Sequence, residues 1–183
     1  MSNELFLSLP ADKIMALTAY GEAASEGAEG MMAVLNVVRN RAQQPNTYAD
    51  KTILAAQGIW HAVVLKTKQF SAFNVGDPVR PKLEALAQTF DSSIKSNTSL
   101  AKAYQLAKMA VAGTLGDNTG GATHYHTSSI LPYWAGSLSE IGSIGAHVFY
   151  TAKKTITENP GTTALLAVGL GVMMFYLLKN RVI

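Results

Sequence analysis

The stretch AYGEAASEGAEGMMAVLNVVRNRA, residues 19–42, constrains the fold more than any other part of the chain. Its second half repeats apolar residues three or four positions apart, namely Met31, Val34, Leu35 and Val38. This spacing gives a helix one apolar face and predicts a helix over residues 31–41. Residues 11–24 have the composition of an earlier helix, and Gly27 and Gly30 predict a break between the two. A mainly α-helical domain is therefore expected.

Capping residues and apolar spacing predict further helices along the chain. Asp12 is expected to cap the first helix, and Asp50 a third one. Residues 81–90 and 99–112 also show helical spacing. The pieces LPYWAG and IGAHVFY are short and predict either strands or loops. The expected fold class is mainly α with minor strands, with long functional loops at 58–81 and 113–150.

Composition excludes several classes of function. The chain has 183 residues, enough for one domain with a sizeable core, and no cysteine, which excludes a thiolate metal site or a cysteine nucleophile. The net charge of +3 is scattered, without the basic run typical of nucleic-acid binding. A weak positive field suits an anionic polymer or a membrane surface. No P-loop or G-x-S-x-G motif occurs, so nucleotide and serine-nucleophile chemistry are not expected.

Three glutamates precede the apolar helix, and they differ in how well each suits a catalytic role. Glu22 ends a mostly apolar helix, where partial desolvation favours the protonated form that a general acid needs. The alternative is an ordinary surface glutamate at a helix end. Glu26 lies four residues on and shares a face with Glu22 if the helix continues, or else it is a solvated or capping residue. Glu29 has the weakest case for a role in chemistry.

The sequence HYH, residues 124–126, invites a metal-site interpretation. In a strand the two histidines share one face, but no third ligand is evident, and no metal is expected. The surrounding TGGATHYHTSSILPYWAG mixes glycines, aromatic rings and hydrogen-bonding groups. That composition suits a sugar-binding groove. The alternative is a packed turn in which Tyr125, Tyr133 and Trp134 fill core.

The C-terminal stretch TTALLAVGLGVMMFYLL, residues 162–178, carries no charge. At about 1.5 Å per residue it would span roughly 25 Å, near the short end for a transmembrane helix. We expect a membrane-inserting helix, and the alternative is a buried core helix. The N-terminus has no signal-peptide pattern. The expected organisation is a domain at 1–150, a linker at 151–161, the apolar helix at 162–178 and a basic tail at 179–183.

Four sequence blocks, in order, resemble those of the SleB-like cell-wall hydrolases, which include spore cortex-lytic enzymes and related phage lysins. The first combines Gly21-Glu22-Ala23, Glu26-Gly27, Gly30, Ala33-Val34 and Val38 with Asn40-Arg41. The others are Gln69-Phe70-Ser71, the stretch GATHYH at 121–126 and the stretch IGAHVFY ending at Tyr150. Together they cover roughly residues 11–150.

The resemblance implies a lysozyme-like domain related to lytic transglycosylases, which cleaves the β-1,4 bond between N-acetylmuramic acid and N-acetylglucosamine. Glu22 matches the catalytic acid, which protonates the leaving oxygen and then deprotonates the C6 hydroxyl of muramic acid. A hydrolase would instead be expected to need a second carboxylate, for which Glu26 is the candidate. The expected groove residues are Gln69, Phe70, Ser71, His124, Tyr125 and Tyr150.

The combined features predict a membrane-tethered enzyme that degrades peptidoglycan, without a cofactor. Its expected partners are glycan strands, a membrane contacted through residues 162–178, and virion proteins, but no nucleic acid. A phage origin is expected, with the enzyme on a virion or at the host envelope. The alternative is a non-catalytic phage structural or ejection protein that inserts the same apolar segment.

Overall fold

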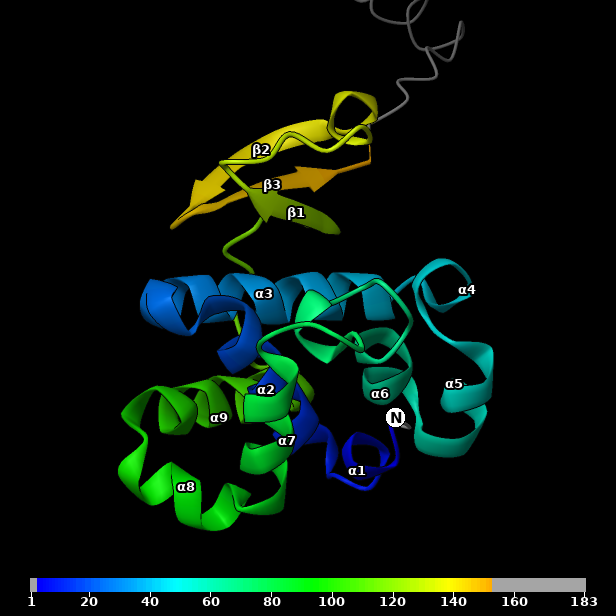
Figure 1. Cartoon of the computed structure of the whole chain (residues 1–183). Helices are drawn as coiled ribbons and strands as arrows, with labels where there is room; N and C mark the ends of the chain where they lie inside the picture. Colours follow the sequence, from blue (N-terminus) through cyan, green and yellow to red (C-terminus); the bar gives the residue numbers. More distant parts are fainter. Residues whose placement is uncertain (1–2, 153–183) are drawn as a thin grey trace, which may run out of the picture. The chain divides into compact units, whose positions relative to one another are not determined.

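The computed structural model describes residues 3–152, which belong to one compact unit. This unit is mainly helical and carries a small three-stranded antiparallel sheet, so the predicted fold class is confirmed for it (Figure 1). The helices are α1 (Glu4–Leu7), α2 (Ala11–Ala23), α3 (Gly27–Ala42), α4 (Pro45–Tyr48), α5 (Lys51–Gln57), α6 (Ile59–Val64), α7 (Arg80–Gln88), α8 (Phe90–Ser96) and α9 (Thr98–Val111). Three 3₁₀ turns are η1 (Ala24–Glu26), η2 (Ser71–Phe73) and η3 (Ala135–Ser137).

Helix α2 forms the centre of the helical body. Every residue from 14 to 20 is buried, and the helix packs against α3, α6, α7 and α9. A helix that is buried all round must satisfy its own polar groups. The Thr18 hydroxyl does so by donating to the Ile14 carbonyl at 2.8 Å. Because α2 is held on all sides, the residues at its C-terminal end, including Glu22, have a fixed position.

Of the two predicted helix caps, one is confirmed and one is wrong. Asp50 caps α5 as predicted, since its Oδ1 accepts from the amides of Thr52 and Ile53. The predicted cap at Asp12 is wrong, because α2 begins directly after Pro10 and no side chain caps it. The carboxylate of Asp12 instead accepts a hydrogen bond from the Tyr104 hydroxyl at 2.9 Å.

Helix α3 begins at Gly27, earlier than the sequence predicts. Gly27 itself forms the break, with a φ of 68° that favours glycine. Gly30 lies inside the helix, and its missing side chain leaves room for Glu26. The predicted apolar face is confirmed, because Met31, Val34, Leu35 and Val38 are all buried.

The sheet contains β1 (His124–Thr127), β2 (Ser139–Ile144) and β3 (His147–Thr151), in the order β1-β3-β2. Opposite residues share a face, and the register pairs Tyr125 with Phe149 and His124 with Tyr150. Strand β2 was not predicted, since its sequence SEIGSI lacks a clear alternation and contains a bulge near Gly142. Helix α8, rich in serine, was also not predicted.

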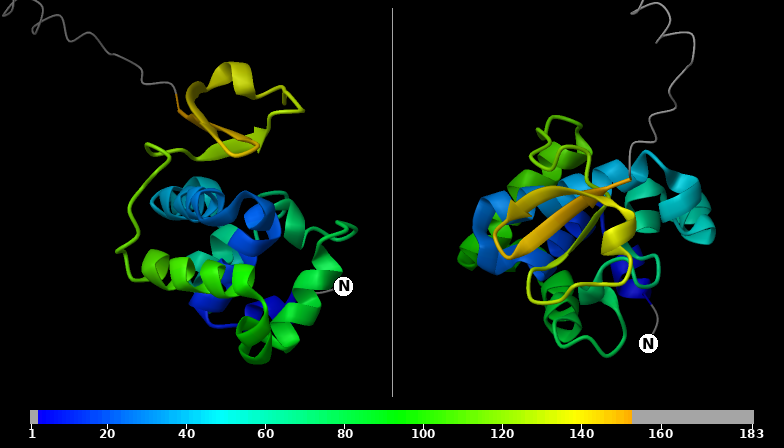
Figure 2. Two further views of the ribbon diagram at one scale, coloured as in Figure 1. Left: turned by 90° about the vertical axis from the view of Figure 1, so that its left-hand side faces the viewer. Right: turned by 90° about the horizontal axis from the view of Figure 1, so that it is seen from above.

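Helix α3 runs directly beneath the sheet, and the other large helices lie on its far side (Figure 1). The long connection from α9 to β1 passes along the outside of the helical body to reach the sheet (Figure 2). This connection brings the strands at residues 124–151 back to the segment that contains Glu22 and Glu26.

The predicted membrane segment, residues 162–178, lies outside the described residues, as does most of the predicted linker at 151–161 and the basic tail at 179–183. Within residues 3–152, every helix is too short or too polar to cross a bilayer.

Candidate active site

Glu22 lies near the end of α2 and is half-buried. Both carboxylate oxygens accept hydrogen bonds from residues far along the chain. Oε1 accepts from the backbone amide of Ala72 at 3.0 Å, and Oε2 accepts from the Tyr125 hydroxyl at 3.0 Å. The carboxylate is therefore held between the loop that follows α6 and the first strand of the sheet.

Tyr125 projects from β1 toward the helical body, on the same face of the sheet as Phe149 and His147. Burial raises the pKa of Tyr125 well above its usual value, and the nearby Glu22 carboxylate raises it further. The phenol is therefore protonated at neutral pH, so that it can donate to a carboxylate and can accept from a carboxylic acid.

Arg41 connects the elements around Glu22. Its guanidinium is buried, with Nε donating to the Thr123 carbonyl at 2.7 Å and Nη1 to the Gln69 carbonyl at 3.3 Å. The group also lies 5.0 Å from the centre of the Phe70 ring. Burial lowers the pKa of Arg41, whereas Tyr125, Tyr48 and Glu22 favour its charged form. One buried cation thus joins α3, the loop carrying Gln69 and the start of the sheet.

These groups border a cleft of about 250 Å³. Its lining comprises Glu22, Arg41, Lys68, Gln69, Ser71, Asn74, Tyr125, Thr127 and His147. Four of the predicted site residues, Glu22, Gln69, Ser71 and Tyr125, are brought together here. Among these lining residues, Glu22 is the one carboxylate. The amide oxygen of Gln69 is buried and accepts no hydrogen bond from the described residues.

Glu26 is not among the residues that line this cleft. Its Oε1 lies 2.8 Å from Nδ1 of His147, and both side chains are largely buried, at 10% and 7% exposed. A Cβ at Gly145 would overlap the Glu26 carboxylate, so that glycine is needed for the pair to form. The His147 ring packs edge-on against Tyr125 at 4.8 Å between centroids. Glu26 therefore supports the strand pair that carries Tyr125.

Three other predicted groove residues lie elsewhere. Phe70 is 1% exposed and packs in the core beneath Arg41. His124 and Tyr150 are opposite each other in the register, so they share the sheet face that is turned away from Tyr125. Their side chains pack with Trp134, at 5.3 and 5.6 Å between ring centroids. Alternation along β1 explains the separation, because consecutive residues point to opposite faces.

The predicted sharing of one face by the two histidines is confirmed by the strand geometry. His126 contacts the Tyr150 hydroxyl through Nε2 at 3.0 Å. Burial lowers the pKa of His124, and Arg41 lowers it further, so its neutral form is favoured. Residues 3–152 contain no cluster of three histidine, aspartate or glutamate side chains suited to a metal ion.

Residues 25–150, more than half of the chain, match the model of the family described as Cell Wall Hydrolase. The chain belongs to this family. The family match contains Glu26 and the cleft residues from Arg41 to His147, and it begins three residues after Glu22. No curated protein sequence matches the chain.

Two solved structures share the fold of this cell wall hydrolase. One is the catalytic domain of the germination-specific lytic transglycosylase SleB from Bacillus anthracis, with 22% identity and a TM-score of 0.52, covering 77% of this chain and 93% of that one. The other is the catalytic domain of the Bacillus cereus SleB protein, with 23% identity and a TM-score of 0.50, covering 77% and 89%. At these identities, the likeness shows a common fold.

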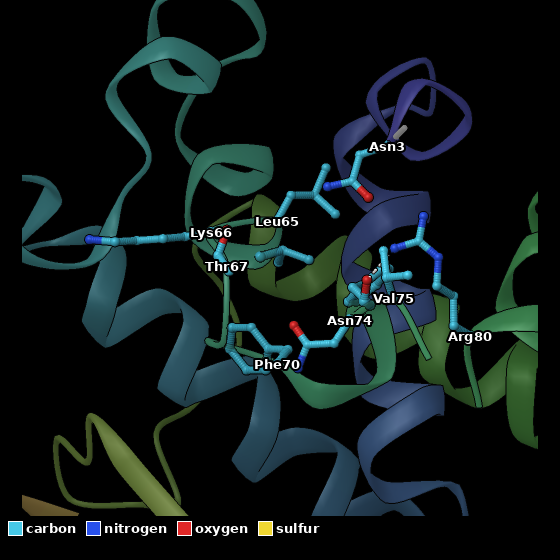
Figure 3. Close-up of a pocket in the computed structure, with 10 residues that line it drawn as sticks. Asn3, Leu65, Lys66, Thr67, Phe70, Asn74, Val75 and Arg80 are labelled. Carbon is cyan, nitrogen blue, oxygen red and sulfur yellow. Dashed lines mark hydrogen bonds between the residues drawn. The ribbon is translucent and has the colours of Figure 1, made fainter. Parts of the chain in front are cut away.

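A second cavity of about 340 Å³ lies on the loop that follows α6 (Figure 3). It is lined by Asn3, Val64, Leu65, Lys66, Thr67, Phe70, Phe73, Asn74, Val75 and Arg80. No carboxylate or histidine is among these residues, so the cavity lacks the side chains that most often act as a general acid or base. Lys66 extends away from the other labelled side chains and donates to the Thr47 carbonyl at 2.6 Å. The smaller cleft at Glu22 is therefore the candidate active site of this family member.

Sequence reasoning did not assign site roles to five cleft residues, namely Arg41, Lys68, Asn74, Thr127 and His147. Arg41 and His147 lie inside the blocks that resemble the family, so the resemblance could have identified them as site residues. Lys68, Asn74 and Thr127 flank such blocks by one to three residues. Only the tertiary fold brings these three to the cleft, Lys68 and Asn74 through the segment that follows α6 and Thr127 through strand β1.

Proposed function

We propose that the chain cleaves peptidoglycan glycan strands between N-acetylmuramic acid and N-acetylglucosamine, with Glu22 as the acid and base. The observation that carries the proposal is the fixed Glu22 carboxylate in a cleft of a cell wall hydrolase, with donors on both oxygens. The similarity of the fold to a lytic transglycosylase domain supports it.

The hydrogen bonds of Glu22 indicate which oxygen carries the proton in this proposal. A backbone amide can only donate, so Oε1 stays an acceptor for Ala72 in both charge states. The proton of the acid form therefore belongs on Oε2, beside the Tyr125 hydroxyl, which can turn to accept it. After Glu22 gives this proton to the glycosidic oxygen, Tyr125 and Ala72 both donate to the carboxylate and stabilise it.

The proposed reaction needs one carboxylate. As the bond from C1 to the leaving oxygen breaks, Glu22 supplies the proton to that oxygen. Glu22 then takes the proton of the muramic C6 hydroxyl, whose oxygen forms a new bond to C1 and gives a 1,6-anhydro end without water. A water-activating second carboxylate is not among the described residues that line the cleft. This arrangement favours a transglycosylase over a hydrolase.

Other cleft groups have proposed roles in binding. The buried, unpaired amide oxygen of Gln69 suits a hydrogen-bond donor of the sugar, such as an N-acetyl amide or a hydroxyl. Ser71 and Tyr125 complete the proposed set of sugar contacts. We propose that Glu26 holds His147 and the sheet in place and takes no part in proton transfer.

Substitution of Glu22 tests this function. Glu22→Gln keeps the shape of the side chain but removes the acid, and we expect release of soluble muropeptides from purified peptidoglycan to fall at least about 100-fold. Mass spectrometry of the wild-type products is expected to show anhydro ends.

Glu29→Gln is the matched control, since Glu29 is an exposed glutamate of the same segment. Unchanged release by Glu22→Gln would disprove the assignment of Glu22. Glu26→Gln is expected to keep anhydro-product formation. A loss of turnover in Glu26→Gln at an unchanged melting temperature would instead give Glu26 a part in the chemistry.

We also propose that the enzyme acts at a membrane-bounded envelope, held through the apolar segment at 162–178, as a phage protein that serves wall penetration or lysis. The support for this proposal is the uncharged run of the sequence and the weak positive charge of the chain. Virion proteins are the proposed additional partners.

A further inference from the structure

Lys68 is an exposed lysine that lines the cleft beside Glu22. The ion pairs of the described residues join Lys13 to Asp91, Arg80 to Glu84 and His147 to Glu26. The ammonium of Lys68 takes part in none of them. Lys68 therefore lines the cleft without a carboxylate partner in residues 3–152, and its charge is available to a ligand.

The backbone of Lys68 is in a conformation that lysine rarely adopts. Its φ is 65°, and among the described residues it is the one non-glycine with a positive φ. It is the third residue of a tight turn closed by the bond from the Gln69 amide to the Lys66 carbonyl at 3.0 Å. Glycine or asparagine is preferred at this position of such a turn. The turn therefore holds a strained lysine at the rim of the cleft, and backbone strain of this kind gathers at functional sites.

The other charged groups of the cleft are already engaged. Arg41 is buried and donates to two backbone carbonyls. Glu22 accepts hydrogen bonds on both of its oxygens. His147 lies against the Glu26 carboxylate. Among the described residues that line the cleft, the exposed positive charge without an ion-pair partner is that of Lys68.

We infer that the Lys68 ammonium binds a carboxylate of the glycan substrate and so makes the cleft selective for strands that carry this charge. This inference rests on the proposed function. The sugar rings and N-acetyl groups of a peptidoglycan strand are neutral. Carboxylates come from the attached peptides, or from the lactyl side chain of a muramic acid residue that carries no peptide. Lysine suits this task as a flexible point charge.

The test compares two forms of one substrate. Purified peptidoglycan is used untreated, or after its carboxylates are converted to neutral methylamides with a carbodiimide and methylamine. We expect neutralisation to raise the KM of the wild type about 2- to 5-fold, as for an exposed ion pair, with little change in kcat. Lys68→Met is expected to show one KM on both forms, equal to that of the wild type on the neutral form. The wild-type preference is also expected to weaken with added salt.

Strands stripped of their peptides by an amidase separate the two sources of carboxylate, because hydrolysis of the amide removes the peptide carboxylates and frees the lactyl carboxylate. Persisting discrimination on these strands shows that Lys68 reaches the lactyl carboxylate, and its loss assigns the contact to the peptide. Lys68→Arg is expected to keep the preference, since the charge is retained. Lys66→Met is the matched control, because Lys66 belongs to the same turn and does not line the cleft.

Cosedimentation of the full chain with the same wall preparations measures binding without turnover. An equal affinity of wild type and Lys68→Met for charged walls, together with an equal KM, would overturn the role of Lys68. A wild type that cleaves neither substrate but binds charged walls in a Lys68-dependent way would contradict the proposed reaction and keep the carboxylate contact. The two proposals can therefore fail separately.

Discussion

At the scale of single residues, Gly21 determines where the Glu22 carboxylate is held. A Cβ at Gly21 would lie 2.9 Å from the Cβ of Ala72 and 3.0 Å from Cδ1 of Leu83. The missing side chain thus lets the loop with Ala72 approach α2 closely. This approach brings the Ala72 amide to Oε1 of Glu22. A steric requirement therefore explains why glycine occupies the first position of the Gly21-Glu22-Ala23 block.

We predict that Gly21→Ala impairs the site more than a surface change does. The added methyl must push the Ala72 loop or Leu83 aside, at a cost of about 1–3 kcal/mol in unfolding free energy. Muropeptide release is expected to fall about 10-fold or more, since small displacements of a catalytic group have effects of this size. Gly116→Ala is the control, because a Cβ at Gly116 meets no atom within 4 Å. Equal activity of the two variants would refute the close-approach argument.

At the scale of secondary-structure elements, the last turns of α3 hold the connection that leads to the sheet. The Asn36 amide donates to the Gly116 carbonyl at 2.8 Å, and Asn40 donates to the Ala122 carbonyl at 3.0 Å. Arg39 donates to the Leu115 carbonyl at 2.5 Å. These polar side chains of α3 thus hold the connection between α9 and β1 in place. The neighbouring Arg41 extends the same set of hydrogen bonds to the residues around the cleft.

The Asp117 carboxylate stabilises the same connection by accepting hydrogen bonds from residues of that segment. Burial alone would raise the pKa of Asp117, but hydrogen bonds from the Thr119 hydroxyl, the Thr119 and Gly121 amides and Asn40 bring it below its usual value. A lowered folded-state pKa means that the ionised group stabilises the fold above its unfolded pKa. This contribution is lost as the pH falls through the folded value.

We predict that Asp117→Asn lowers the unfolding free energy at pH 7 by about 1 kcal/mol, because the carboxylate is exposed and its hydrogen bonds are partly screened. The difference from the wild type is expected to shrink as the pH falls below about 4, where the aspartate of the unfolded chain takes up a proton. It is expected to vanish below the lowered pKa of the folded state. Thermal melts at pH 7 and pH 3 measure this. A difference that stays constant with pH would show that the charge of Asp117 is not responsible.

At the scale of the whole molecule, the described lining of the cleft comes from residues 22–147. We predict that a chain truncated before Pro160 still releases muropeptides and no longer partitions into detergent. The full chain is expected to partition, because residues 162–178 are uncharged.

Leu170→Arg in the full chain is the matched variant for this experiment. A charge at the middle of the apolar segment costs about 2.5–3.5 kcal/mol of insertion free energy, so partitioning is expected to fall while cleavage continues. If the truncated chain still entered the detergent phase, the tether would not lie in residues 162–178.

The sequence by itself determined the features that depend on neighbours along the chain. Apolar spacing predicted the buried face of α3, and Asp50 predicted the start of α5. The family blocks directed attention to Glu22, Gln69, Ser71 and Tyr125, which the structure gathers in one cleft. Local pattern and local hydrogen bonding are sufficient for such predictions.

Only the tertiary structure decided which polar side chains meet. Alternation along β1 turns Tyr125 toward Glu22 and His124 away from it, and this choice of face depends on how the strand is placed over α3. Glu26, which resembles Glu22 in the sequence, is drawn to His147 more than a hundred residues later. Lys68 reaches the cleft through a turn in a conformation that its residue type does not favour. These outcomes depend on long-range packing, which the spacing of residues in one segment does not encode.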